Sequence, residues 1–189
     1  MTSTSETARI VREKIAQAVD ILNETETDLW LTLVRETSQV KDPVLDLILG
    51  FDLTWLSGLL IHRNGSCTAI VGRFDATNFE QLGAYDNVVT YDQAFLPALT
   101  QAIRSFDPDN IAINTSDNDP AADGLTYGLY RLLNKALADT PYASRLVSAE
   151  SIIGALRGRK TPTEIGLIEA AVVESQTAIA ELHEVIRPG

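Results

Sequence analysis

The chain has 189 residues, 45% of them hydrophobic, which suits one globular domain or one domain with an appendage. Its 26 acidic and 15 basic residues give a net charge of −11, which opposes nucleic-acid binding because that binding needs cationic side chains. The single Cys67 can form neither an internal disulfide nor a zinc site. The polar start resembles no signal peptide, and no run approaches the roughly 20 apolar residues of a membrane span. We therefore expect a cytoplasmic protein that binds neither membranes nor nucleic acid.

Hydrophobic spacing and turn residues predict alternating helices and strands. The pattern predicts helices over 5–24, 41–50, 75–82, 92–106, 124–139 and 150–157. It predicts strands over 28–35, 87–92, 111–116 and 145–150, and a hairpin over 58–73. The hairpin turn is expected at Asn64-Gly65, a preferred pair for tight turns. In the second helix we expect Asp42 as N-cap, Pro43 at the first position and Gly50 at the end.

This alternation, with one hairpin embedded, predicts an α/β fold in which helices flank a mixed sheet. The only compositional break is Arg-Gly-Arg-Lys at 157–160. Gly158 can cap the preceding helix, and the neighbouring cations suit that helix's negative end. We therefore expect a domain boundary here.

A long helix is predicted after this boundary. Thr161 and Glu164 match a capping box, and Pro162 occupies the first helical position. Over about 25 residues, or about 37 Å, an apolar stripe recurs at spacings of three and four. Only Ser175 interrupts the stripe, which consists of Ile165, Ile168, Val172, Ile179, Leu182 and Ile186. We expect this face to pack on residues 1–160, to pack on another copy of the chain, or to remain exposed and fray.

The residue pattern supplies no catalytic machinery. His62 and His183 stand in neither an HExxH nor an HxH spacing, so a histidine metal site is not predicted. The acidic stretch at 117–124 fails as a calcium loop because alanines occupy the ligand and glycine positions. Cys67 lies in an apolar strand and is interpreted as a buried hydrophobe rather than a nucleophile. No phosphate-binding loop, dinucleotide fingerprint or nucleophile elbow occurs.

Three residues remain as candidates for a partner-facing or substrate-facing site: Arg35, Trp55 and His62. Trp55 precedes a strand in a loop, where it either joins the core or anchors a contact. Arg35 follows the first strand together with Glu36, and it either points into a cleft or belongs to a solvated turn. His62 lies in the hairpin and has no evident catalytic partner.

One segment resembles a known domain junction. It comprises Lys160-Thr161-Pro162-Thr163-Glu164-Ile165, then Ile168-Glu169-Ala170-Ala171, and finally Ile186-Arg187-Pro188-Gly189. It resembles the start of the catalytic domain in the creatinase, prolidase and aminopeptidase P family, the "pita-bread" metallopeptidases. Upstream, residues 54–58 resemble the family's Y-L-T-G turn with Trp55 in the tyrosine position, and residues 122–133 resemble a helix of some members.

The resemblance implies a creatinase-type N-terminal domain with a ribonuclease-H-like fold at 1–157. Residues 158–189 would be a linker and the first helix of a catalytic domain, so we expect Arg187-Pro188-Gly189 to lead into further chain. The family's two divalent ions (Mn, Co or Zn) are held by two Asp, one His and two Glu, all downstream of this helix. The chain itself would therefore contain no catalytic, cofactor-binding or metal residue.

The implied role is dimerisation, with active-site capping or substrate selection, in an Xaa-Pro peptidase that acts on peptides. The implied partners are the missing C-terminal catalytic domain and a second copy of the chain. One alternative is a non-catalytic peptide- or protein-binding module of the same fold, as in a histone-chaperone subunit. Another is an independent small-molecule domain with its site at a switch point of the sheet.

Overall fold

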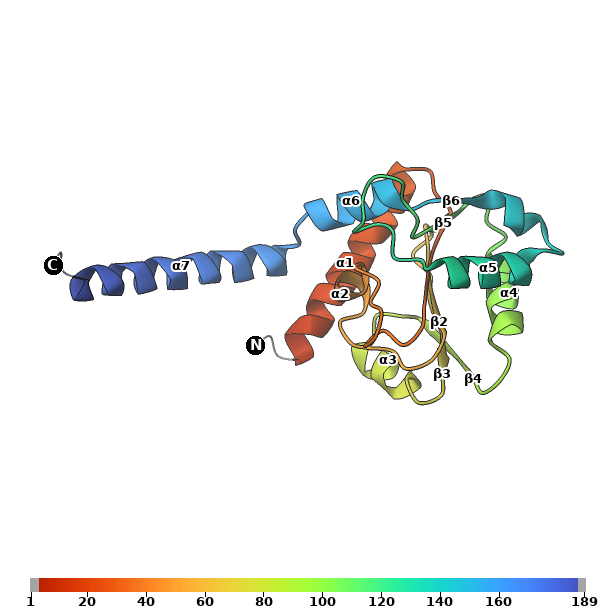
Figure 1. Ribbon diagram of the computed structural model, residues 1–189, viewed down its shortest axis with the longest axis horizontal. Helices are drawn as coiled ribbons and strands as arrows, with labels where there is room; N and C mark the ends of the chain where they lie inside the picture. The colour runs from red at the N-terminus through yellow and green to blue at the C-terminus, as the bar shows by residue number, and fades with distance from the viewer. Residues whose placement is uncertain (1–3, 187–189) are drawn as a thin grey trace.

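A computed structural model describes residues 4–186 as a three-layer α/β domain from which one long helix projects (Figure 1). The helices are α1 (Thr4–Glu24), α2 (Leu45–Ile48), α3 (Ala76–Leu82), α4 (Phe95–Phe106), α5 (Tyr127–Leu137), the 3-10 helix η1 (Pro141–Arg145), α6 (Glu150–Gly158) and α7 (Pro162–Val185). The strands are β1 (Leu29–Val34), β2 (Ser57–His62), β3 (Cys67–Gly72), β4 (Asn87–Tyr91), β5 (Ile111–Ile113) and β6 (Leu146–Ser148). The predicted α/β class and long C-terminal helix are confirmed.

The strands form one mixed sheet in the order β4-β3-β2-β1-β5-β6. The pairs β1–β2 and β2–β3 are antiparallel, whereas β1–β5, β5–β6 and β3–β4 are parallel. Three antiparallel strands followed by two parallel ones form the predicted ribonuclease-H-like arrangement, and β4 extends it at one edge. The predicted hairpin joins β2 to β3 through Asn64-Gly65, where Gly65 has a φ of +95°.

Each face of the sheet is covered by its own group of helices. Along β1, Trp30 and Val34 point into a core formed with α1, α2, α3 and α6. Leu29, Leu31 and Leu33 point into the opposite core, formed with α4 and α5. β1 is therefore buried on both faces, which explains why its sequence is a nearly continuous apolar run.

Several predicted helix ends differ in the structure; α4, for example, begins at Phe95 rather than at residue 92, and α2 ends at Ile48 rather than at Gly50. α2 begins at Leu45, so Asp42 is not its N-cap; the carboxylate instead accepts from the Val44 amide at 3.0 Å before the helix starts. α5 begins three residues later than predicted, after the Thr126 N-cap. Gly158 is the last residue of α6 rather than its cap, because the amide that closes the final turn belongs to Arg159.

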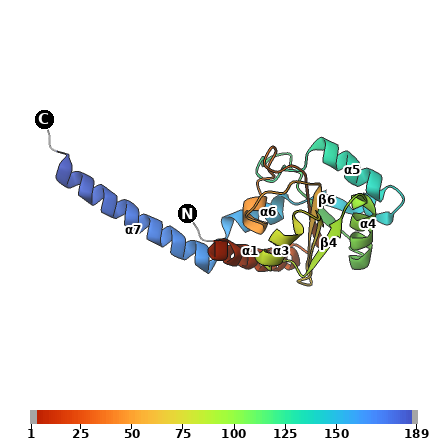
Figure 2. The ribbon, with the colours of Figure 1, turned by 90° about the horizontal axis from the view of Figure 1, so that it is seen from below.

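The capping box of α7 is confirmed: the Thr161 hydroxyl accepts from the Glu164 amide, and the Glu164 carboxylate accepts from the Thr161 amide. The helix leaves the domain beside α1 and extends away from it in both views (Figures 1 and 2). Beyond its first turn, Leu167 is partly buried and the other apolar side chains up to residue 182 are exposed. The exposed ones are Ile165, Ile168, Val172, Val173, Ile179, Leu182 and, just after the helix, Ile186. Of the three predicted outcomes for the stripe, packing on residues 1–160 is not observed in the described part of the chain, and Arg187-Pro188-Gly189 lies outside that part.

Candidate functional site

Two of the three predicted site residues lie at the same end of the two central strands β1 and β2. Arg35 directly follows β1 and Trp55 precedes β2 by two positions, and the strands meet there in the pair Val34–Ser57. His62 ends β2 and pairs with Leu29 at the opposite end of these strands. The structure therefore brings Arg35 and Trp55 to one side and separates His62 from them.

His62 closes the hairpin turn. Its Nδ1 accepts from the Asn64 amide at 3.1 Å, and its ring stacks on Phe106 with centroids 4.9 Å apart. The first contact lies within the hairpin turn and the second joins the hairpin to α4; neither one pairs His62 with an acid or base for proton transfer. A structural role therefore accounts for the position of His62.

Trp55 is half-buried, which lies between the two predicted alternatives of a core residue and an exposed contact residue. Its ring packs directly against β3 at Gly72, where a Cβ would lie 2.5 Å from the Trp55 Cε3 atom. Phe74 meets the indole edge-to-face at 5.5 Å, and Tyr91 lies 5.9 Å away. Phe74 is itself 66% exposed. Trp55, Phe74 and Tyr91 thus form an aromatic patch, part of which faces solvent.

The buried carboxylate of Asp75 holds the loop that carries Trp55. The Asp75 side chain accepts from the amides of Thr54 and Trp55 at 3.3 and 3.4 Å. On the other side of the patch, the Tyr91 hydroxyl donates to the Leu56 carbonyl at 2.6 Å. Burial, together with the nearby Asp75 carboxylate, raises the pKa of Tyr91, so its hydroxyl remains a donor at neutral pH. These bonds hold the patch in place.

Arg35 borders a pocket of about 410 Å³ at the end of β1. The pocket is lined by Val34, Arg35, Glu36, Gln39, Val40, Asp42, Gly124, Thr126 and Leu129. Arg35 and Glu36 are exposed, and among the described residues Arg35 forms no hydrogen bond or ion pair. Its guanidinium group is therefore available to a carboxylate or another anionic group.

The inner wall of this pocket contains a buried polar network that the sequence did not reveal. Asp42 is 2% exposed, and its Oδ2 accepts from the Asn114 amide at 2.8 Å. The Asn114 oxygen in turn accepts from the Trp30 indole at 2.7 Å. Burial raises the pKa of Asp42, although the hydrogen bonds from Asn114 and Val44 oppose the shift. Asp42 preceding Pro43 suggested only a helix cap, and no pattern linked it to Asn114.

Asp42 also contacts the loop before α5. A Cβ on Gly124 would lie 2.1 Å from the Asp42 Cγ atom, so only glycine allows this approach. Within the described chain, no cation pairs with Asp42. The network therefore holds the loops around the pocket through neutral donors rather than through an ion pair.

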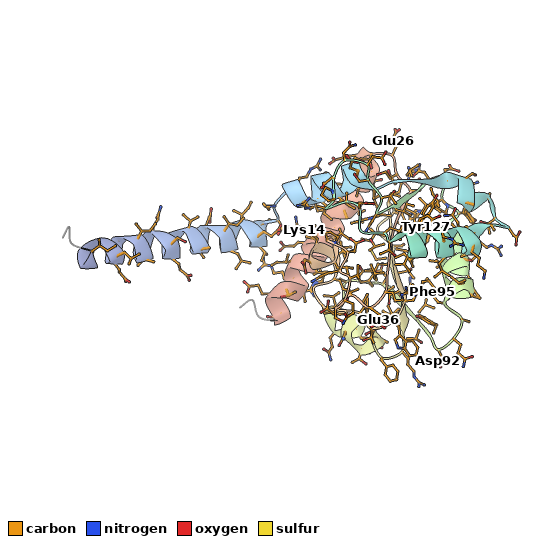
Figure 3. The ribbon with its side chains drawn as sticks, viewed as in Figure 1. Lys14, Glu26, Glu36, Asp92, Phe95 and Tyr127 are labelled. Atoms are coloured by element: carbon orange, nitrogen blue, oxygen red, sulfur yellow. The ribbon has the colours of Figure 1, made fainter. Side chains whose placement is uncertain are left out.

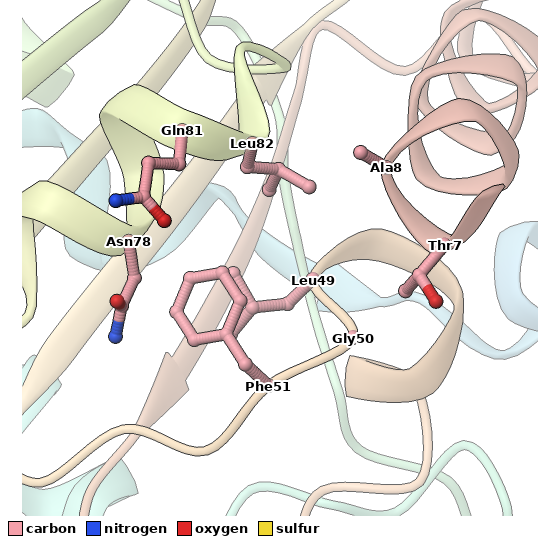
Figure 4. A pocket seen from close by; sticks show the side chains of 8 residues that line it. All are labelled: Thr7, Ala8, Leu49, Gly50, Phe51, Asn78, Gln81 and Leu82. Carbon is pink, nitrogen blue, oxygen red and sulfur yellow. The ribbon is translucent and has the colours of Figure 1, made fainter. Parts of the chain in front are cut away.

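A second pocket, of about 290 Å³, lies between α1, the segment after α2, and α3 (Figure 4). Its apolar side chains include Leu49, Phe51 and Leu82, and the amides of Asn78 and Gln81 stand on the α3 side. None of the predicted site residues lines it. With no charged residue in its lining, the pocket has no group suited to acid–base chemistry.

The described residues contain no group of three or more His, Cys, Asp or Glu side chains placed to hold a metal ion. The Cys67 thiol is buried, and that burial, reinforced by Asp86, raises its pKa to about 12. The thiol is therefore protonated at neutral pH and is a poor nucleophile. Within residues 4–186, no helix has both the length and the apolar character needed to cross a bilayer.

Comparison with solved structures identifies the fold as that of a creatinase/prolidase N-terminal domain, as the junction motif predicted. An Xaa-Pro dipeptidase from Bacillus anthracis is 19% identical with a TM-score of 0.59, and the match covers 95% of this chain and 44% of that one. The N-terminal domain of the cytoplasmic peptidase PepQ from Mycobacterium tuberculosis is 14% identical with a TM-score of 0.52, covering 77% and 97%.

The N-terminal domain of the FACT complex subunit SPT16 from chickpea is also similar, with 14% identity, a TM-score of 0.60, and coverage of 95% and 45%. No protein-family model matches the chain, and no curated protein matches it in sequence. The chain thus spans less than half the length of the Bacillus dipeptidase.

Proposed function

We propose that this chain is the non-catalytic amino-terminal part of a larger Xaa-Pro peptidase of the prolidase and aminopeptidase P type. Residues 1–157 would form the N-terminal domain, and residues 158–189 the linker and first helix of a catalytic domain. The coverage values support this division. The match to the Bacillus dipeptidase takes in 95% of the chain, whereas the match to the isolated PepQ domain takes in 77%.

The observation that carries this proposal is the apolar surface of α7. Val173 is 61% exposed and lies next to Val172 rather than on the predicted stripe, so apolar residues occupy more than one face of the helix. A helix that is apolar on several faces is typical of the interior of a domain. A single partner helix would cover only one of these faces. We therefore infer that a further domain encloses α7.

The charges of α7 oppose the simplest alternative, a pair of α7 helices from two copies. Between residues 161 and 186 the chain contains no Lys or Arg, whereas Glu164, Glu169, Glu174, Glu181 and Glu184 are all present. Two such helices side by side would repel each other. The proposed homodimer would accordingly form through surfaces of the α/β domain.

In this arrangement the end of the sheet with Trp55 and Arg35 would cap an active site or select substrate. The aromatic patch offers ring faces and edges to an apolar side chain, and Arg35 offers a cation to a peptide carboxylate. The two divalent ions would belong to the catalytic domain, since the described residues hold no ligand set for them. A cytoplasmic location accords with the single buried thiol of Cys67 and with the structural similarity to the cytoplasmic peptidase PepQ.

Amide hydrogen exchange tests the enclosure of α7. In the 189-residue chain, we expect the amides from residue 166 onward to exchange much faster than those of β1, because an exposed helix without packing partners, although formed, opens locally at low free-energy cost. In the product of the complete reading frame, the same amides should be protected to the level of β1. Equal exchange of α7 in both proteins would refute the proposal.

A second candidate function is a binding module without catalysis. It is favoured by the SPT16 domain, whose TM-score of 0.60 equals or exceeds those of the peptidases. Metal analysis of the complete product separates the two. Two divalent ions per chain would support the peptidase, and a folded but metal-free protein would support the binding module.

A further inference from the structure

Lys14 of α1 is a fully buried cation at the junction of three segments (Figure 3). Its Nζ donates to the Leu156 carbonyl at 2.8 Å and to the Arg159 carbonyl at 2.6 Å, and it pairs with the Glu164 carboxylate at 2.9 Å. These acceptors belong to α6, to the connector and to the first turn of α7, respectively. One ammonium group therefore links both helices and the segment between them.

The Lys14 ammonium group finds all its acceptors only in this arrangement of α1, α6 and α7. A buried ammonium requires hydrogen-bond partners on all sides, because leaving water costs several kcal/mol. Here the Gln17 side chain at 3.2 Å completes the set of acceptors. The carbonyls at the end of α6 carry the negative end of its dipole, and Glu164 caps the positive end of α7. Lys14 thus satisfies groups that only this arrangement of the two helices brings together.

Two acids of α1 bind the same junction. The Glu13 carboxylate accepts from the Thr163 hydroxyl at 2.7 Å and from its amide at 3.3 Å. Near the other end of α1, Glu24 forms two hydrogen bonds with Arg159, at 2.8 and 2.7 Å. The connector is therefore fixed on both sides of Lys14.

These contacts are concentrated at the base of α7. Its remaining length is exposed, so only its first turns define its direction. The helix has 24 residues, or about 36 Å, and a tilt of about 10° at its base would move its far end by about 6 Å. Small changes at Lys14 are therefore amplified along the helix.

We propose that Lys14 is a positioning residue which, together with Glu13 and Glu24, fixes the direction of α7 relative to the α/β domain. The functional consequence of this inference rests on the function proposed above. In that case a catalytic domain built around α7 would be held at a set angle to the end of the sheet that carries Trp55 and Arg35. The fixed direction itself is a property of the 189-residue chain and is tested on it alone.

The test measures a distance by pulsed electron paramagnetic resonance. Nitroxide labels are placed on α4 through Ser105→Cys and on α7 through Ala178→Cys, both exposed positions. Cys67 is buried with a pKa of about 12 and should remain unlabelled at neutral pH. Residue 178 lies about 24 Å along α7, where a tilt of about 10° gives a displacement of about 4 Å. We expect a narrow distance distribution for the parent, one broader by about 4 Å or more in Lys14→Met, and an unchanged one in the control Lys41→Met.

Near-ultraviolet circular dichroism reports whether each variant retains its domain packing. An unchanged distribution in folded Lys14→Met would overturn the proposal. If that variant fails to fold, the double variant Glu13→Gln, Glu24→Gln keeps Lys14 and removes the flanking charges. Broadening in the double variant then supports the proposal, and an unchanged width rejects it. A negative result would leave the hydrogen-exchange test of α7 enclosure unaffected, so the two proposals can fail separately.

Discussion

The Lys14 ammonium and the Glu164 carboxylate lie 2.9 Å apart, and the Lys14 side chain has no exposure to solvent. Removing one partner of such a pair leaves the other without compensation. We therefore expect Lys14→Met to lower the free energy of unfolding by about 3 kcal/mol. The control Lys41→Met removes an exposed pair with Asp46 and should cost about 0.5 kcal/mol or less. Guanidinium unfolding followed by circular dichroism measures both, and equal effects would show that burial of Lys14 contributes nothing.

The contribution of Glu13 to the stability of the fold is expected to depend on pH. The hydrogen bond from the Thr163 hydroxyl is the main reason that the pKa of Glu13 falls from 4.5 to about 2. Because the folded pKa is depressed, this stabilisation is present above pH 4.5 and disappears as the pH falls towards 2. Glu13→Gln should therefore be less stable than the parent at neutral pH and approach it in acid. A difference that stayed constant over this range, measured by urea unfolding, would contradict the assignment.

The contact of Gly72 with Trp55 can be tested by fluorescence. Gly72→Ala places a methyl group where the indole now lies, so the ring must move outward. We expect red-shifted emission and stronger quenching by acrylamide, while Trp30, buried in the core, contributes a constant background. The matched control is Gly154→Ala, where a Cβ meets nothing within 4 Å. Identical spectra for Gly72→Ala and the parent would argue against this packing.

Gly124 provides a test of the pocket next to Arg35. The alanine methyl group of Gly124→Ala would collide with the Asp42 carboxylate, which Asn114 and Val44 hold in place. We expect a loss of about 1–3 kcal/mol in the free energy of unfolding. Gly128→Ala, in the exposed first turn of α5, should instead be neutral or gain up to about 1 kcal/mol. Thermal and urea unfolding distinguish these outcomes, and equal stability of both variants would exclude the collision.

Much of the fold is predictable because its signals are local. The hairpin turn depends on Asn64-Gly65, and the start of α7 depends on Thr161 and Glu164, which lie within a few residues of each other. The double-sided burial of β1 is likewise visible in its apolar run. Each of these features needs only neighbouring residues.

The unpredicted features all depend on contacts between distant segments. Asp42 bonds to Asn114, 72 positions away, and the helix that it was expected to cap begins only at Leu45. Lys14 pairs with Glu164, 150 positions further along the chain, and nothing in the sequence around Lys14 distinguishes it from a surface lysine of an amphipathic helix. Arg35 and Trp55 lie at the same end of the sheet only because β1 and β2 pair there, and their role in substrate or partner contact stays a prediction.

Peptidase activity tests the central claim most directly. The 189-residue chain and the product of the complete reading frame should be assayed in parallel on an Xaa-Pro dipeptide, with and without added Mn²⁺, Co²⁺ or Zn²⁺. We predict metal-dependent cleavage by the complete product alone and none by the 189-residue chain. Metal-dependent cleavage by the 189-residue chain itself, or a reading frame that ends at Gly189, would contradict the assignment of this chain as a non-catalytic amino-terminal domain.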